Sequence, residues 1–132
     1  MRRTFGVLLG ILLPMAAQAG PETYACQFAG GGRAGWTAAE VWVQYDPGTG
    51  VAKVHDEIIE RFVGKPVKAR VIAANAKKLT VAWSVSVTSN SSQRAQMDYG
   101  LTIERPGLWA SLRAVPARYD NSFRAKGSCK RK

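Results

Sequence analysis

Residues 79–88, LTVAWSVSVT, alternate apolar and polar or small side chains along their whole length. Leu79, Trp83 and Val87 therefore share one face, while threonine, alanine and serine side chains occupy the other. A period of two is the spacing of a β-strand with one buried face. Residues 95–104, AQMDYGLTIE, repeat the pattern after the polar loop 89–94. The two segments together predict a long β-hairpin.

Six shorter segments show the same β pattern, separated by turn residues. The densest turn, DPGTG at residues 46–50, lies between strands predicted for 36–45 and 51–55. The other predicted strands span residues 23–29, 67–74, 108–115 and 122–128. Eight short strands at such spacings predict an all-β domain, either a small antiparallel up-and-down barrel or a rolled sandwich.

Residues 56–63 break the β pattern. Ile58, Ile59 and Phe62 fall at the spacing of a helix with one apolar face. Pro66 would end such a helix, because the residue before a proline avoids the helical region. The sequence therefore predicts a short helix over residues 56–63, packed on the sheet or over the barrel mouth.

The first nineteen residues have the three regions of a secretory signal peptide. Arg2 and Arg3 precede an apolar run over residues 5–17, and residues 17–19, AQA, match a small-x-small cleavage site. As a helix the apolar run would rise only about 20 Å, short of the roughly 30 Å of a membrane core. We expect residues 1–19 to be removed and residues 20–132 to form a single β domain, periplasmic or secreted, with no later transmembrane segment.

Cysteine usage supports the same compartment. Cys26 and Cys129 are the two cysteines of the chain and lie near opposite ends of the expected mature domain. An exported protein meets an oxidising environment, so the sequence predicts a disulfide between them. The first and last elements should then be neighbours, as the closure of a sheet requires.

Patterns for catalysis and metal binding are weak. His55 is the single histidine, so a catalytic triad would have to use it. A zinc site usually needs several histidine or cysteine ligands, which the chain does not offer once its two cysteines form a disulfide. The carboxylates, Asp56 and Glu57 among them, show no spacing that selects a catalytic pair. The sequence therefore predicts a non-enzymatic domain without a cofactor or a metal, in which His55 is an ordinary residue at a strand end. A hydrolase with an unrecognised carboxylate site is the alternative.

Charge is the strongest functional signal. Without Arg2 and Arg3 the chain keeps 17 basic and 9 acidic side chains, a net charge of +8. Concentrated positive charge attracts polyanions over about a Debye length, roughly 8 Å at physiological salt. Solubility and a basic C-terminal tail are the alternative interpretation of the same charge. The candidate anion-binding residues are the seven basic residues from position 113 onward: Arg113, Arg118, Arg124, Lys126, Lys130, Arg131 and Lys132.

These observations favour a binding domain whose basic C-terminal surface contacts an anionic envelope polymer or a lipid headgroup. Nucleic acid is a weaker hypothesis, because Trp109, the tryptophan near these basic residues, can equally be half buried in its strand. Trp83 is predicted to lie in the core. Trp36, Trp42 and Trp109 are candidates for lining an apolar pocket, which would make a small apolar ligand the second type of partner.

Two families resemble this chain in outline. Residues 34–36, AGW, loosely match the Gly-x-Trp signature of lipocalin-like secreted barrels, and this resemblance implies a carrier of a small apolar ligand. Residues 24–26, YAC, are similar to the Tyr-x-Cys motif of bacterial periplasmic lysozyme inhibitors, which implies inhibition of an exported enzyme. The strong positive charge departs from the second family, since such lysozymes are themselves basic. Small residues would either leave room for a ligand or let a narrow barrel pack tightly: Ala69, Ala73, Ala110 and Ala114.

Overall fold

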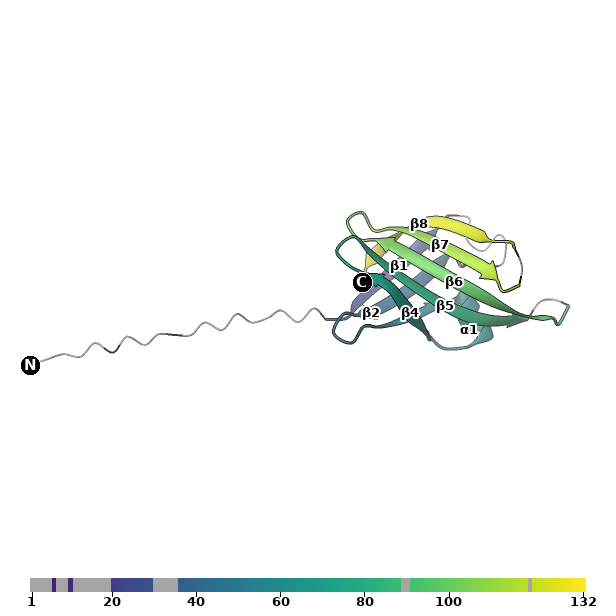
Figure 1. The fold of residues 1–132 in the computed structure, drawn as a ribbon, viewed down its shortest axis with the longest axis horizontal. Helices are drawn as coiled ribbons and strands as arrows, with labels where there is room; N and C mark the ends of the chain where they lie inside the picture. The colour runs from purple at the N-terminus through teal and green to yellow at the C-terminus, as the bar shows by residue number, and fades with distance from the viewer. Residues whose placement is uncertain (1–5, 7–9, 11–19, 30–35, 89–90, 119) are drawn as a thin grey trace, which may run out of the picture.

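The computed structural model describes residues 20–29, 36–88, 91–118 and 120–132, together with Gly6 and Gly10. The expected signal peptide otherwise lies outside the described residues. Within them, eight antiparallel strands follow one another around a closed barrel, and the last strand pairs with the first (Figure 1). This confirms the all-β prediction and selects the closed barrel over the rolled sandwich. Among the described residues, none belongs to a helix long and apolar enough to cross a membrane.

The two long alternating segments form the hairpin of β5 and β6, as predicted. Their register is unbroken from Lys78 paired with Glu104 to Thr88 paired with Arg94. The alternation places the buried side chains of both strands inside the barrel. The strands are β1 (Glu22–Phe28), β2 (Glu40–Asp46), β3 (Val51–Asp56), β4 (Val67–Ala74), β5 (Lys78–Thr88), β6 (Arg94–Glu104), β7 (Trp109–Pro116) and β8 (Phe123–Arg131).

Inward side chains pack the barrel interior. Trp83 is 4% exposed, which confirms its prediction as a core residue, and its ring stacks on Tyr99 with the centroids 5.5 Å apart. Leu101 is fully buried beside them, and Ala110 and Ala114 of β7 belong to the same cluster. Since protein interiors are close-packed, the small alanines allow a narrow barrel to close around the two large rings.

The second strand begins later than predicted. The sequence predicts Trp36 within this strand, but β2 begins at Glu40. Trp36 lies in the preceding segment, where its carbonyl oxygen accepts a hydrogen bond from the Tyr99 hydroxyl at 2.9 Å. The tertiary contact with β6 therefore overrides the strand propensity of Trp36.

The last strand ends later than predicted, which changes the description of the C-terminus. The sequence places its end at Ser128, whereas β8 continues to Arg131. The reason is pairing with β1: Cys129 is opposite Cys26, and Arg131 is opposite Tyr24. Lys130 and Arg131 are therefore strand residues and not part of a basic tail.

The predicted helix is present as α1 (Glu57–Phe62), and it interrupts the pairing of β3 with β4. Asp56 caps its N-terminus, because the carboxylate accepts a hydrogen bond from the Ile59 backbone N–H at 2.7 Å. Ile58 and Ile59 are buried. Before the helix, β3 and β4 share only the register from Ala52 to Val54. The segment after the helix therefore stands beside the outer face of β3.

Burial raises the pKa of the Asp56 carboxyl. Folding then favours the protonated form, so the stability it contributes is present at low pH and is lost as the pH rises through the folded-state pKa. We expect Asp56→Asn, which keeps an acceptor for Ile59, to be at least as stable as the native protein at pH 7. We expect Asp56→Ala to lose about 1 kcal/mol with the cap. Urea unfolding at pH 7 and pH 4 checks both variants. The free energy of unfolding of the native protein should rise relative to that of Asp56→Asn when the pH is lowered from 7 to 4. An unchanged difference between the two proteins contradicts the raised pKa of Asp56.

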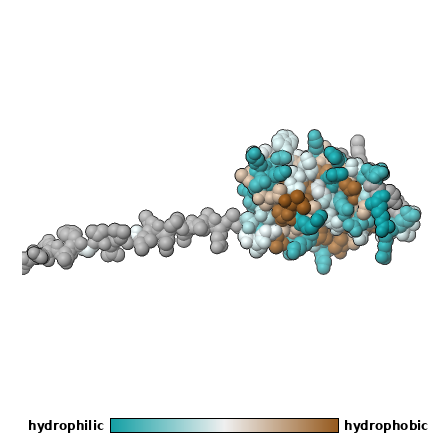
Figure 2. Space-filling view, viewed as in Figure 1, coloured by the Kyte–Doolittle hydropathy of each residue, from teal (hydrophilic) through white to brown (hydrophobic). Residues whose placement is uncertain are grey.

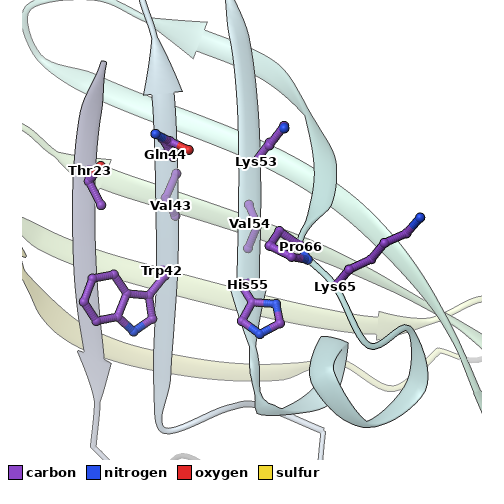
Figure 3. A pocket seen from close by; sticks show the side chains of 9 residues that line it. All are labelled: Thr23, Trp42, Val43, Gln44, Lys53, Val54, His55, Lys65 and Pro66. Atoms are coloured by element: carbon purple, nitrogen blue, oxygen red, sulfur yellow. The ribbon is translucent and has the colours of Figure 1, made fainter. Parts of the chain in front are cut away.

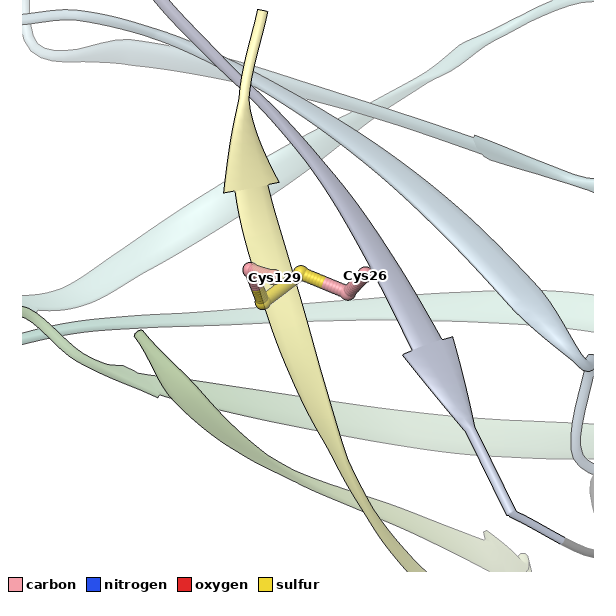
Figure 4. The surroundings of a disulfide bond; sticks show 2 residues. All are labelled: Cys26 and Cys129. Atoms are coloured by element: carbon pink, nitrogen blue, oxygen red, sulfur yellow. A yellow bond between two sulfur atoms is a disulfide. The ribbon is translucent and has the colours of Figure 1, made fainter. Parts of the chain in front are cut away.

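The predicted disulfide joins Cys26 of β1 to Cys129 of β8 (Figure 4). The two residues are direct cross-strand partners and are separated by 103 positions in the sequence. Both side chains are buried. The covalent bond therefore lies at the seam where the barrel closes.

Candidate functional site

The outward side chains of β8 form a row of positive charges. Ala125 and Cys129 point inward, so the residues that alternate with them face solvent. Successive outward positions on a strand are about 7 Å apart. Four exposed cations occupy this row, with the neutral Ser128 among them, and together they are called the β8 stripe: Arg124, Lys126, Lys130 and, directly after the strand, Lys132.

The strands on either side of β8 add one cation to this surface and no acid. Arg113 of β7 is the direct cross-strand partner of Arg124. The other outward positions described on β7 and β1 are neutral. Carboxylates flank the surface at Asp98 and Glu104 on β6 and at Glu40 on β2, each two strands from β8. Positive potential is therefore concentrated along β8.

Two of the predicted anion-binding residues, Arg118 and Arg131, belong neither to the β8 stripe nor to the strand position beside it that Arg113 occupies. The Nη2 atom of Arg131 lies 3.3 Å from Glu22 Oε1 and donates a hydrogen bond to the Tyr24 hydroxyl at 3.2 Å. Arg105 binds the same carboxylate at 3.2 Å. Arg131 is therefore held in a network that ties β8 to β1. Arg118 lies in the connection between β7 and β8, at a positive φ of 75°.

Two exposed tryptophans flank the β8 stripe. Trp109 is 67% exposed and is the cross-strand partner of Ser128. On the other side, Trp42 of β2 is 40% exposed, and the Lys132 ammonium lies 5.9 Å from its ring centroid. Indole rings beside cations offer apolar contact area next to positive charge. The strand alternation indicates that both rings face outward, but it could not show that they lie on either side of β8.

A groove of about 550 Å³ opens over the outer faces of β2 and β3 (Figure 3). Trp42 and His55 are cross-strand partners on these two strands. Lys65 and Pro66, from the segment between α1 and β4, form another part of the boundary. The lining contains two lysines and no carboxylate: Thr23, Trp42, Val43, Gln44, Lys53, Val54, His55, Lys65 and Pro66. This set is called the β2–β3 groove.

The only histidine, His55, connects the groove to the helix. Its Nε2 atom lies 3.0 Å from Glu60 Oε2 on α1, and its Nδ1 atom is buried without a hydrogen-bond partner in the structure as described. The described residues contain no group of three or more histidine, cysteine, aspartate or glutamate side chains that could hold a metal ion. The contact with Glu60 gives His55 a structural role, in which it ties α1 to β3.

The three tryptophans predicted to line an apolar pocket are not brought together. Trp42 and Trp109 face outward, whereas Trp36 is partly buried against the core. Trp36 lines a separate pocket of about 240 Å³ with Met97 and Phe123. On the face displayed in Figure 2, hydrophilic side chains alternate with small apolar patches.

No protein-family model, curated protein or solved structure matches the chain. The resemblances to lipocalin-like barrels and to lysozyme inhibitors therefore remain hypotheses based on short motifs. Residues 34 and 35 of the lipocalin-like motif lie outside the described residues.

Proposed function

We propose that this is an exported, non-enzymatic domain that binds an anionic polymer of the cell envelope through the β8 stripe. One observation carries the proposal: the described outward positions of β7, β8 and β1 hold four cations and no acidic side chain, and Lys132 directly after β8 adds a fifth cation. The disulfide supports function in an oxidising compartment outside the cytosol.

The geometry of the β8 stripe suits a repeating ligand better than a single ion. From Arg124 to Lys132 the backbone rises through eight residues, or about 26 Å at about 3.3 Å per residue. Each exposed cation binds one anionic group weakly in water, because the charges are solvated and screened by salt. Several such contacts on one chain act together, since the first contact raises the effective concentration for the next. A polyanion can therefore bind where a free anion would not.

The alternative functions find less support in the described residues. An apolar-ligand carrier needs interior space, whereas Trp83, Tyr99 and Leu101 pack the centre of the barrel. Inhibition of an exported enzyme would need a partner with an acidic surface opposite the β8 stripe. Binding of an apolar ligand would not weaken as salt is added, and binding to an enzyme would require that acidic surface and not a polymer.

We expect the triple variant Arg124→Gln, Lys126→Gln, Lys130→Gln to bind immobilised lipopolysaccharide about a hundredfold more weakly at low salt. Each lysine or arginine beside an anionic surface contributes roughly a fivefold gain in affinity. Binding of the oxidised native protein should also fall steeply between about 50 and 500 mM salt, as the Debye length shortens. Surface plasmon resonance measures both effects, and vesicles with and without anionic lipid distinguish a polymer from a lipid headgroup.

A matched control removes the same charge from the opposite side of the barrel. Lys68 and Arg70 lie on β4, four strands from β8 in either direction, and Arg61 is an exposed cation on α1, which packs on β3 and β5. Changing these three residues to glutamine should alter affinity by less than about threefold, because they lie beyond a Debye length from the β8 stripe. Equal losses in the two triple variants would show attraction by net charge alone and would contradict the proposal. Salt-insensitive binding would favour an apolar ligand instead.

A further inference from the structure

Trp42 provides a flat apolar surface at the edge of the β2–β3 groove. Its cross-strand partner Ala25 also points outward, yet Ala25 is only 8% exposed while Trp42 is 40% exposed. Figure 3 shows the indole extending from β2 toward β1, the strand that carries Ala25. The ring thus shields the alanine with one face and leaves part of its surface open to the groove.

The backbone holds the opposite side of the groove in place. The N–H groups of Val63 and Gly64 both donate to the Ile59 carbonyl oxygen, at 2.8 and 2.9 Å. Gly64 has a φ of 85°, a conformation that glycine adopts without steric cost, and it turns the chain out of α1. The turn leads directly into Lys65 and Pro66, which border the groove. The groove is therefore part of the fold and does not depend on the rotamers of mobile side chains alone.

The electrostatics of the groove favour an anion. Lys53 and Lys65 come from different elements and line the same space, and no carboxylate accompanies them in the lining. Lys132 adds a third ammonium beside the Trp42 ring. A neighbouring groove of about 300 Å³ shares Lys53 but includes Asp46 and no aromatic residue. An anionic ligand with an apolar face should therefore prefer the β2–β3 groove.

We infer that the β2–β3 groove binds a single acidic sugar, a sugar ring that carries a phosphate or a carboxylate. Its volume of about 550 Å³ lies within the usual range for small-ligand sites. The indole contacts the C–H face of the ring, Lys53 and Lys65 bind the anionic group, and Thr23 and Gln44 supply hydroxyl and amide partners for sugar hydroxyls. The two rings of the lining, Trp42 and His55, are cross-strand partners on one sheet face, so they lie side by side and do not form the facing pair that would sandwich a nucleobase.

This inference rests on the proposed function, because the acidic sugar would be one unit of the polymer bound along the β8 stripe. Lys132 connects the two surfaces: it continues the β8 stripe, and its ammonium lies beside Trp42. The stripe then supplies attraction that depends on charge alone. The groove supplies selectivity for the kind of unit that carries the charge.

The test is a titration of the oxidised protein followed by the indole ¹H–¹⁵N signal of Trp42, which a Trp42→Phe variant identifies. The probes are glucose 1-phosphate, glucuronate, uncharged glucose, adenosine monophosphate and inorganic phosphate. We expect the two acidic sugars to shift the Trp42 signal at millimolar concentration and glucose to leave it unchanged. Lys53→Gln and Lys65→Gln should each weaken binding about fivefold. Lys78→Gln, an exposed lysine of β5 outside both the groove lining and the β8 stripe, is the matched control and should change it less than twofold.

The outcomes separate the two proposals. Polymer binding that depends on the β8 stripe, with no response of Trp42 to either acidic sugar, overturns the groove assignment and leaves the proposed function intact. Acidic-sugar binding at Trp42, with polymer binding unaffected by the stripe variant, overturns the proposed function alone. Tighter binding of adenosine monophosphate, or equal binding of inorganic phosphate, overturns the sugar assignment. Urea unfolding of each variant confirms that it remains folded.

Discussion

Replacing Gly127 with alanine is expected to destabilise the protein by about 3 kcal/mol, because a side chain does not fit at the barrel seam. Gly127 of β8 is opposite Phe28 of β1. A Cβ atom at this position would overlap the backbone carbonyl oxygen of Gln27 and would lie 2.9 Å from Cδ1 of Phe28. Relief requires the two backbones to separate, which would break the pairing that closes the barrel.

Gly100→Ala is the matched control for this substitution. Gly100 lies within β6, and a Cβ atom there would meet nothing within 4 Å. The control should change stability by less than about 0.5 kcal/mol, or raise it slightly, because alanine reduces the entropy of the unfolded chain. Urea unfolding of both variants gives the comparison. Similar small effects at the two positions would contradict the close approach of β8 to β1.

The strands whose pattern is long and regular could be predicted from the sequence within a residue or two. The β5–β6 hairpin is the clearest case, because alternation over eleven residues fixes which face of each strand is buried. The disulfide could be predicted from the cysteine count together with the oxidising compartment that the first nineteen residues lead us to expect. The end of β8 could not, because Lys130 and Arg131 begin a run of consecutive charged residues without the apolar–polar alternation of a strand. Their place in the sheet depends on pairing with β1, which lies about a hundred positions away in the sequence.

Of the two parts of the candidate site, one could be predicted from the sequence and the other could not. The charge of the β8 stripe is visible in the sequence, and the prediction includes all four of its residues. The β2–β3 groove is not visible there, because it depends on how early the pairing of β3 with β4 ends and on where α1 leaves Lys65. The contact between Lys132 and Trp42 joins residues ninety positions apart in the sequence and exists only once the barrel has closed. Local periodicity carries no information about such contacts.

Removing the disulfide by Cys26→Ala and Cys129→Ala is expected to cost about 4 to 5 kcal/mol, the largest effect anticipated for this protein. The bond links residues 103 positions apart, so it removes much of the conformational entropy of the unfolded chain. A domain of this size is typically stable by about 5 to 15 kcal/mol, so the loss would be a large share of the total. Without the bond, the pairing of β8 with β1 must close the barrel unaided.

The covalent effect can be separated from the packing of the two buried sulfur atoms. Cys26→Val with Cys129→Val keeps apolar volume at the seam while removing the bond. Urea unfolding should show both double variants far below the oxidised native protein, with the valine pair the more stable of the two because it leaves the smaller cavity. Reductant should lower the stability of the native protein and leave the valine pair unchanged. A valine pair as stable as the oxidised protein would mean that strand pairing and packing alone hold the seam closed, and that the disulfide adds little to the stability of the barrel.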